Sequence, residues 1–237
     1  NSLKTQNKFF IVIPARSGSK GIHNKNIIKL NGISLLHRAL YFASEITEGE
    51  NICLSTDSEE YINHALEIKK PIIRKRPNHL SQDKSLALSV WKDAIKFMKK
   101  QNPESQFESS IYLEPTSPLR NKIWIMKLIQ EFNQSNDDLW MSLSETDSKY
   151  RLEKQFILNN DGFPSSLFSN DDKYSIRQNS NKTYHKDGVF YMANNNYILN
   201  TLNLLDGKIK GKVNKGKYIN IDNLDDLKYG EYLLKEY

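Results

Sequence analysis

The stretch FFIVIPARSGSKGIHNKN, residues 9–26, determines the fold class that the sequence predicts. It opens with five apolar residues, and a short apolar run that ends in a glycine-containing loop is typical of a strand buried in a parallel sheet. The loop has no carboxylate, two glycines (Gly18 and Gly21) and four side chains that can carry positive charge, namely Arg16, Lys20, His23 and Lys25. Backbone N–H groups in such a turn can surround phosphate oxygens. The stretch therefore predicts an α/β fold with an anion-binding loop after its first strand.

The glycine spacing excludes two familiar phosphate-binding loops. A Walker A loop needs a lysine directly after its second glycine, but Lys20 precedes Gly21. A dinucleotide fingerprint needs three glycines in the pattern G-x-G-x-x-G, and only Gly18 and Gly21 are present here. The loop is therefore a phosphate loop of another kind, or a solvated basic turn.

Downstream of this loop, β-rich runs alternate with helical patterns. The patterns predict helices over 34–43, 58–68, 84–100, 123–132 and 224–237, and strands over 51–55, 71–77, 109–118, 188–193 and 217–221. Such alternation favours a mostly parallel sheet covered by helices, with ligands beyond the carboxyl ends of the strands. We expect one domain over 1–237. The alternation fails at about 146–184, which predicts an insertion that forms an arm, a lid or a dimer contact.

The overall composition is that of an ordinary globular protein, with 38% hydrophobic and 26% charged residues. The single cysteine, Cys53, excludes an internal disulfide and favours the reducing cytoplasm. No apolar run approaches the roughly 20 residues that cross a bilayer, so we expect no membrane segment. The net charge of +6 comes from scattered lysines, which does not favour nucleic acid as a partner. His37, His64 and His79 have no second ligand at the sequence spacing of a metal site.

Six strings extend the first stretch into a resemblance that covers nearly the whole chain. They are LNGISLL (30–36), LSTDSEE (54–60), KRPNHLSQDKS (75–85), EPTSPLR (114–120), RQNSNKTYHKDGVFY (177–191) and INIDNLDDL (219–227). In this order they resemble the CMP-sialic acid synthetases, the acylneuraminate cytidylyltransferases. The resemblance implies a Rossmann-like, mostly parallel sheet flanked by helices, of the nucleotide-diphospho-sugar transferase type. It also implies a homodimer that transfers CMP from CTP to a nine-carbon acidic sugar, using Mg²⁺ and releasing pyrophosphate.

The resemblance assigns roles to matched positions. Arg16 and Lys25 would be catalytic, Arg16 through the triphosphate and Lys25 by countering charge in the transition state. The nucleotide would be bound by Arg16, Ser19, Lys20, Lys25, Asn26 and Arg76. Arg177 and Gln178 would face the sugar, where the planar guanidinium suits a carboxylate. For Arg76, an ordinary surface position remains the alternative.

Three positions depart from the family pattern. Glu114 replaces a glutamine near the sugar, Asp187 replaces an asparagine, and Asn220 replaces the first aspartate of a metal-binding D-x-D pair. Asp222 then remains the candidate Mg²⁺ ligand, although it could instead cap the last helix. Because a buried glutamate repels an acidic sugar, Glu114 and Asp187 suggest a substrate-binding pocket retuned for another acceptor. Our hypothesis is a sugar with an amino or amidino group, or one less acidic than sialic acid.

Two alternatives remain open at this point. One keeps nucleotidyl transfer but changes the acceptor to another sugar or a phosphonate. The other is a paralogue that binds nucleotide without catalysis, which Asn220 and Glu114 would explain.

Overall fold

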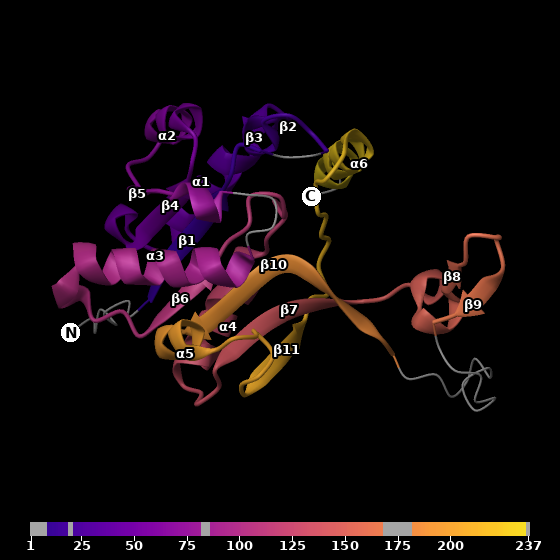
Figure 1. Ribbon diagram of the computed structural model, residues 1–237. Coiled ribbons are helices and arrows are strands. Elements are labelled where there is room, and N and C mark those ends of the chain that lie inside the picture. The colour runs from indigo at the N-terminus through magenta and orange to yellow at the C-terminus, as the bar shows by residue number, and fades with distance from the viewer. Residues whose placement is uncertain (1–8, 19–20, 82–85, 168–181, 236–237) are drawn as a thin grey trace.

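The computed structural model describes residues 9–18, 21–81, 86–167 and 182–235, and its centre is a seven-stranded sheet (Figure 1). The strand order is β11-β7-β10-β6-β1-β4-β5. The strands are β1 (Phe9–Ala15), β4 (Ile52–Thr56), β5 (Ile72–Lys75), β6 (Ser109–Tyr112), β7 (Leu139–Glu145), β10 (Tyr184–Asn194) and β11 (Ile209–Val213). Only β10 runs antiparallel to its neighbours within this sheet. The prediction of a mostly parallel α/β sheet is confirmed.

Helices cover both faces of the sheet, so the fold has three layers (Figure 1). One face packs against α1 (Leu35–Ile46), α2 (Glu59–Leu66) and α4 (Lys122–Asn133), and the other against α3 (Ala87–Gln101) and α5 (Asn195–Asn200). The last helix, α6 (Leu224–Lys235), packs beside the short hairpin of β2 (Lys29–Leu30) and β3 (Ile33–Ser34). Within the described residues, no helix is both long and apolar enough to cross a membrane.

Short 3-10 turns connect several of these elements. They are η1 (Lys25–Ile27), η2 (Gly49–Asn51), η3 (Asn78–Leu80), η4 (Pro103–Ser105), η5 (Ser148–Tyr150) and η6 (Leu152–Lys154). The first of them, η1, lies in the loop after β1 and carries two of the predicted nucleotide-binding residues.

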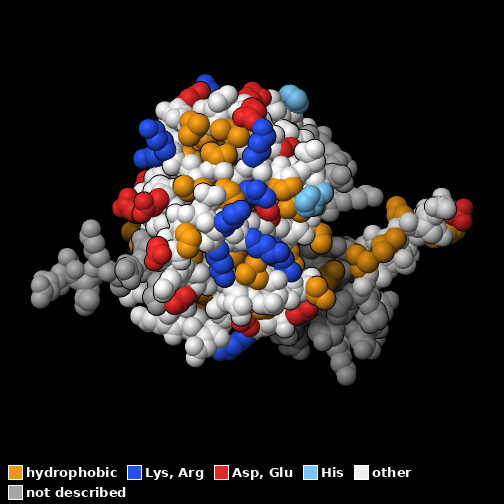
Figure 2. Space-filling view, turned by 60° about the vertical axis from the view of Figure 1, so that its left-hand side comes forward, with side chains coloured by type: hydrophobic (Ala, Val, Ile, Leu, Met, Phe, Trp, Pro, Cys, Tyr) orange, Lys and Arg blue, Asp and Glu red, His pale blue; other side chains and the backbone are white. Residues whose placement is uncertain are grey.

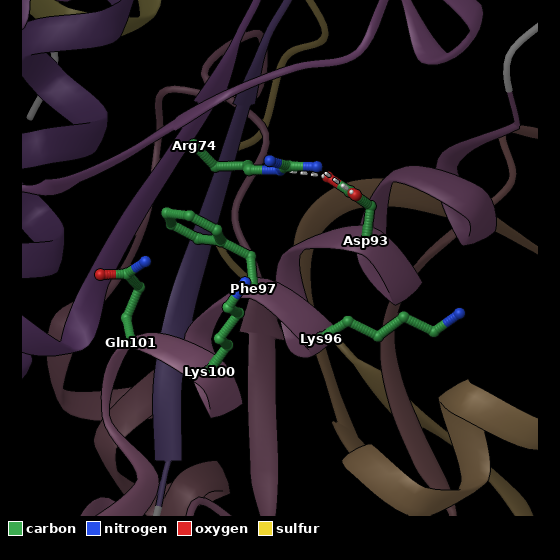
Figure 3. Close-up of a pocket in the computed structure, with 6 residues that line it drawn as sticks. All are labelled: Arg74, Asp93, Lys96, Phe97, Lys100 and Gln101. Carbon is green, nitrogen blue, oxygen red and sulfur yellow. Dashed lines mark hydrogen bonds and ion pairs between the residues drawn. The ribbon is translucent and has the colours of Figure 1, made fainter.

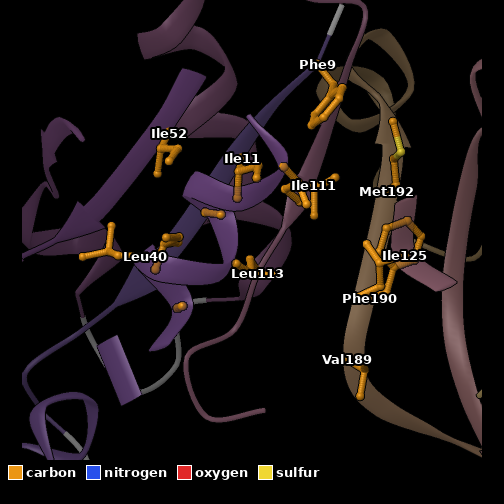
Figure 4. Packing of buried hydrophobic residues seen from close by; sticks show 14 of the residues in the cluster. Phe9, Ile11, Leu40, Ile52, Ile111, Leu113, Ile125, Val189, Phe190 and Met192 are labelled. Carbon is orange, nitrogen blue, oxygen red and sulfur yellow. The ribbon is translucent and has the colours of Figure 1, made fainter. Parts of the chain in front are cut away.

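Strand β1 is the centre of the core because both of its faces are buried. Phe9, Ile11 and Ile13 point into the layer of α1, α2 and α4, where Figure 4 shows Phe9 and Ile11 among residues from other strands and helices. Phe10 and Val12 point into the opposite layer with α3. Side chains alternate between the faces of a strand, so a continuous apolar run can fill two layers at once.

The connection from β7 to β10 projects from the sheet as an arm (Figure 1). Its described part contains the hairpin of β8 (Phe156–Leu158) and β9 (Pro164–Ser166), in the segment where the sequence alternation fails. Figure 2 shows hydrophobic side chains along the arm where it stands away from the body. They are exposed: Tyr150, Leu152, Phe156, Ile157, Leu158, Phe163 and Leu167.

The prediction of a strand over 217–221 is wrong. These residues follow β11 as an irregular segment, held by a hydrogen bond from Ile221 N to Thr116 O of 2.8 Å. Ile219 and Ile221 are buried against Leu30 and Leu233. The alternation of apolar and polar residues over 217–221 therefore reflects packing against a local cluster outside the sheet. The strand at this edge of the sheet is instead β11, which pairs with β7.

Candidate active site

A pocket of about 210 Å³ lies at the carboxyl ends of β1, β5 and β6. Parallel strands bring their carboxyl ends to one edge of a sheet, which is where ligands bind in such folds. Its lining consists of Pro14, Arg16, Lys25, Asn26, Arg76, Ala87, Val90, Tyr112, Glu114, Pro115 and Thr116. Four predicted nucleotide-binding residues and one predicted sugar-binding residue are thus on one surface, although they come from three separate parts of the chain.

Hydrogen bonds at Ser17 and at Asn26 hold the described part of the loop after β1 in place. Ser17 donates from its backbone N and its Oγ to the two carboxylate oxygens of Asp57, at 2.9 and 3.0 Å. The buried Asn26 side chain donates to the backbone oxygen of Arg16 at 3.1 Å and so closes the loop. These bonds position the Arg16 backbone and the Lys25–Asn26 turn together. Asp57 is a supporting residue that the sequence analysis did not identify, although it follows directly on the end of β4.

Gly21 lets this loop pack against the last segment of the chain. A Cβ placed on Gly21 would lie 2.3 Å from the backbone oxygen of Asp222, closer than any side chain can approach. The Lys25 ammonium contacts Asp222 Oδ1 at 2.7 Å at the same junction. The predicted metal ligand therefore lies beside the predicted catalytic lysine.

Asp222 does not cap α6, which was its alternative role. Asn223 Oδ1 accepts hydrogen bonds from the backbone N atoms of Asp225 and Asp226, at 2.9 Å each. Asp226 in turn accepts from the backbone N of Asp222 and of Asn223, which completes a reciprocal cap. The Asp222 carboxylate, with 72% of its side chain exposed, is left to face Lys25 and solvent.

Arg76 is a buried residue whose guanidinium lines the pocket, so it does not have the ordinary surface position that was its alternative. Its Nη2 donates to the backbone oxygen of Ser55 at 2.9 Å, and its Nε donates to Ser55 Oγ at 3.2 Å. Desolvation by burial lowers the pKa of Arg76. An arginine held this firmly has little side-chain freedom left to lose when an anion binds.

Glu114, which lines the pocket, lies close to Gly188 and Asn220. Gly188 has a positive φ of 73°, and a Cβ there would lie 2.4 Å from Ser117 Oγ, 2.8 Å from Asn220 Oδ1 and 3.1 Å from Glu114 Oε2. Ser117 Oγ also donates to Asn220 Oδ1 at 2.6 Å. Glycine is required by both the backbone conformation and the lack of space. Glu114 and Asn220, far apart in the sequence, are therefore neighbours in the fold.

Burial raises the pKa of Glu114, and the nearby positive charge of Arg120 acts against this shift. Arg120 is half-buried, and desolvation lowers the pKa of Arg120 to about 10. Its guanidinium donates to the backbone oxygens of Glu114 at 2.6 Å and Val189 at 3.2 Å. A carboxyl in such a place takes up a proton more readily than an exposed glutamate.

The placement of Asp187 requires a correction. Its side chain is fully buried, and the carboxylate accepts hydrogen bonds from Ser142 Oγ, Ser144 Oγ, the backbone N of Val189 and Asn214 Nδ2. The predicted contact between Asp187 and the sugar is wrong for this structure, because the carboxylate binds together β7 and β10. The next residue, Gly188, lies beside Glu114, which lines the pocket.

Four other predicted site residues lie outside the described part of the chain. They are Ser19 and Lys20 of the phosphate loop, and Arg177 and Gln178 of the segment before β10.

A second hollow, of about 330 Å³, lies away from these loops between β5 and α3 (Figure 3). Its Arg74 donates to both oxygens of Asp93 at 2.8 Å and lies over the ring of Phe97 at 5.1 Å. Figure 3 shows the guanidinium directed at Asp93, with Lys96 and Lys100 at the rim. Because the smaller pocket lies at the carboxyl ends of the strands and gathers Arg16, Lys25 and Arg76, it is the better candidate for binding a triphosphate.

The oxygen atoms near Lys25 fit a bound Mg²⁺. The exposed Asp222 carboxylate contacts Lys25, and Asn220, two positions earlier in the chain, has an amide oxygen that accepts from Ser117. Mg²⁺ takes oxygen ligands and commonly needs only one or two carboxylates together with the phosphates of a nucleotide. The donor set present is therefore sufficient in type, with Asp222 as its carboxylate.

The family model described as Cytidylyltransferase matches residues 10–227 of the chain, which includes every element that forms the pocket. The chain belongs to the cytidylyltransferase family. This confirms the resemblance that the sequence motifs indicate, and identifies an enzyme of the nucleotidyltransferase class.

Three similar proteins are a flagellin modification protein and two enzymes named as cytidylyltransferases of acidic sugars. This chain is 29% identical over 229 residues to the post-translational flagellin modification protein B of Campylobacter coli, and the match covers 94% of each chain. It is 30% identical over 190 residues to the pseudaminic acid cytidylyltransferase of Campylobacter jejuni, covering 78% of each. It is also 30% identical to the N-acylneuraminate cytidylyltransferase of Escherichia coli over 194 residues, which are 82% of this chain and 44% of that protein.

Solved structures agree on the fold. CMP:2-keto-3-deoxy-manno-octonic acid synthetase complexed with CTP has a TM-score of 0.67 at 15% identity, covering 96% of this chain and 98% of that one. The 4-diphosphocytidyl-2C-methyl-D-erythritol synthase of Anaerococcus prevotii has a TM-score of 0.61 at 15% identity, covering 96% and 97%. The predicted Rossmann-like nucleotidyltransferase fold is confirmed.

The raised pKa of Glu114 predicts a specific pH dependence of stability. An acid whose pKa is higher in the folded protein costs stability as pH rises above its unfolded value, about 4.3. Glu114→Gln removes this titration, so the variant should gain stability over the wild type as pH increases from about 4 towards 8. Urea unfolding across this range measures the difference.

Glu131 provides a control of opposite sign. A hydrogen bond from Lys212 lowers the pKa of Glu131, so Glu131→Gln should lose stability relative to the wild type as pH rises towards the unfolded value of about 4.3, and the difference should stay constant at higher pH. Parallel stability curves for the wild type and Glu114→Gln would contradict the burial of a titrating carboxyl at position 114.

Proposed function

We propose that the protein transfers CMP from CTP to a nine-carbon acidic sugar of the sialic, legionaminic or pseudaminic acid type, releasing pyrophosphate. One observation carries the proposal. Arg16, Lys25 and Arg76 place three cationic side chains on a single pocket beyond the carboxyl end of β1. That arrangement suits a triphosphate, and the names of the similar proteins indicate CTP and a nonulosonic acid as the substrate pair.

In the transfer step the protein mainly positions the two substrates and neutralises phosphate charge, and it forms no covalent bond to them. A hydroxyl oxygen of the sugar forms a bond to the α-phosphorus of CTP, the bond from that phosphorus to the bridging oxygen breaks, and pyrophosphate leaves as the hydroxyl proton is released. Arg16 and the loop amides hold the phosphates, and Lys25 offsets the charge that grows in the transition state. The immobile Arg76 orients the nucleotide.

Mg²⁺ belongs to this proposal as the cofactor. When bound, it supplies positive charge to the phosphate oxygens. Asp222 would hold it, with Lys25 as the neighbouring cation that competes for the same carboxylate at 2.7 Å. When CTP binds, Lys25 would exchange Asp222 for a phosphate, and Asp222 would then be free to hold the metal; until then the ion pair keeps both charges in place.

A homodimer in the cytoplasm is the form that we propose for the enzyme. The described part of the arm exposes seven large apolar side chains, four of them within a short hairpin that has little core of its own, which favours contact with a second copy. The single buried cysteine suits a reducing compartment.

The first prediction of this proposal concerns turnover. With Mg²⁺, CTP and one nonulosonic acid should release pyrophosphate, whereas UTP, ATP and GTP should not. Lys25→Ala should lower kcat by roughly 10²–10³, because a cation at the developing charge is lost. Lys100→Ala, in the second hollow, is the matched control and should leave the rate unchanged. Absence of pyrophosphate release with every nucleotide and every nonulosonic acid would refute the proposal.

The second prediction concerns the acceptor, because Glu114 and Asn220 favour a pocket retuned for another sugar. Glu114→Gln should shift the ratio of kcat/KM towards sialic acid, since a carboxyl that repels an acidic sugar is replaced by a neutral amide. An unaltered acceptor preference would contradict the hypothesis that the pocket is retuned.

The variant Asn220→Asp distinguishes a functioning enzyme from an impaired paralogue. A large gain in rate would indicate that the metal site of the wild type is impaired, and little change would indicate that it functions.

The third prediction concerns the arm. Replacing Phe156, Leu158 and Phe163 by serine should convert a dimer into a monomer, because it removes apolar area from the proposed contact. Light scattering after size-exclusion chromatography measures the mass. Leu202→Ser, which changes an apolar side chain that is 90% exposed on the body, is the matched control and should stay dimeric. A monomeric wild type at every concentration would contradict the proposal.

A further inference from the structure

Tyr61, in the first turn of α2, is a buried residue whose hydroxyl has no hydrogen-bond partner within the described residues. Its ring packs in the hydrophobic cluster that also contains residues of β1 and α1. A buried hydroxyl without a partner costs free energy, because the hydrogen bonds that it makes to water in the unfolded chain are lost. Native proteins keep few such groups, so each of them requires an explanation.

The start of α2 is attached to the loop after β1. Asp57, directly before the helix, accepts hydrogen bonds from the backbone N and the Oγ of Ser17. Glu60, the neighbour of Tyr61 in the sequence, accepts from Asn24 Nδ2 at 3.1 Å. The helix also packs against η1. The turn that carries Tyr61 therefore supports the loop that lines the pocket.

Asn26, in η1, is the polar neighbour of the Tyr61 hydroxyl. Burial raises the pKa of Tyr61, and the nearby backbone and side-chain N–H groups of Asn26 act against this shift. Neither group reaches the phenol oxygen with the geometry of a hydrogen bond. Asn26 is itself buried, lines the pocket and donates from Nδ2 to the backbone oxygen of Arg16 at 3.1 Å. It therefore connects the surroundings of Tyr61 to the pocket.

The two side chains carry complementary groups that are not in use. The hydroxyl of Tyr61 has a proton to donate, and the amide oxygen of Asn26 accepts no hydrogen bond within the part of the chain that the structure describes. A phenol is a donor, and an amide oxygen has two lone pairs. A hydrogen bond from Tyr61 to Asn26 would continue through Nδ2 to the backbone of Arg16.

We propose that Tyr61 is a positioning residue for the nucleotide, which donates a hydrogen bond to Asn26 Oδ1 when a triphosphate occupies the pocket. The inference rests on the proposed function in one respect, the binding of CTP. Lys25 precedes Asn26 in η1 and Arg16 accepts from it, so phosphates held by these two cations draw on Asn26 from both sides. Because the new bond exists only in the bound protein, its free energy adds to the affinity for the nucleotide.

The variant Tyr61→Phe tests this role, because it removes the hydroxyl and keeps the ring. The ligand-free variant should be more stable than the wild type, with a Tm higher by about 2–4 °C, since a buried hydroxyl without a partner is gone. Calorimetric titration with CTP and Mg²⁺, without an acceptor sugar, should show binding that is weaker by about three- to tenfold. A tyrosine that serves only the core would not change stability and affinity in opposite directions.

Ser109 provides the matched control. Its hydroxyl is also buried without a partner, but it lies at the start of β6, whereas the pocket is at the carboxyl end of that strand. Ser109→Ala should raise Tm for the same reason as Tyr61→Phe, and it should leave the affinity for CTP unchanged.

A double variant tests whether Tyr61 acts through Asn26. In the background of Asn26→Ala, the further change Tyr61→Phe should no longer weaken the binding of CTP, because the acceptor of the proposed bond is already missing. A further loss of affinity in this background would overturn the proposed route.

These measurements do not use turnover, so they separate this inference from the proposed transfer. Equal affinities of the wild type and Tyr61→Phe for CTP, or a lower Tm of the ligand-free variant, would overturn the role of Tyr61 alone. A wild type that binds CTP without releasing pyrophosphate would contradict the transfer, while the comparison of affinities would still decide the role of Tyr61. A wild type that does not bind CTP would overturn both.

Discussion

The close packing of the loop after β1 against the backbone of Asp222 is the constraint on which the rest of the site depends. Gly21 can approach that backbone because it has no side chain, and Lys25 then meets Asp222 at 2.7 Å. This single contact joins the beginning and the end of the chain. It also sets the place of Asp222, the proposed metal ligand, relative to the loop after β1, which no local segment could do alone.

Two carboxylates near the pocket, the buried Asp187 and the half-buried Glu114, have different partners. Asp187 is compensated by hydroxyl, amide and backbone donors between β7 and β10, and the next residue, Gly188, lies beside Glu114. Glu114 has the positive charge of Arg120 nearby, yet desolvation dominates and raises its pKa. An unpaired buried charge is costly, so proteins neutralise it or pair it. Here one acid is paired with polar donors, and the other is poised to accept a proton beside the sugar position.

The sequence by itself determined the fold class and most of the pocket. A continuous apolar run before a glycine-containing basic loop indicates a buried parallel strand wherever it occurs, because strand periodicity is a local property. The cap of α2 at Ser58 and the burial of Cys53 are local in the same sense. Motifs in the right order then indicated the family, and with it Arg16, Lys25, Asn26 and Arg76 as residues of one site.

The tertiary structure alone decided where charges and apolar faces end up. The alternating apolar residues over 217–221 pack against a hydrophobic cluster and do not join the sheet. A buried irregular segment and a paired strand can have the same alternating sequence, so the sequence alone does not distinguish them. Asp187 faces the sheet interior, Asn223 caps α6 in place of Asp222, and His37 stacks on His64. Each of these outcomes depends on which side chain from a distant segment arrives at the same place. Long-range packing determines which distant residues come into contact, and their spacing along the sequence does not predict it.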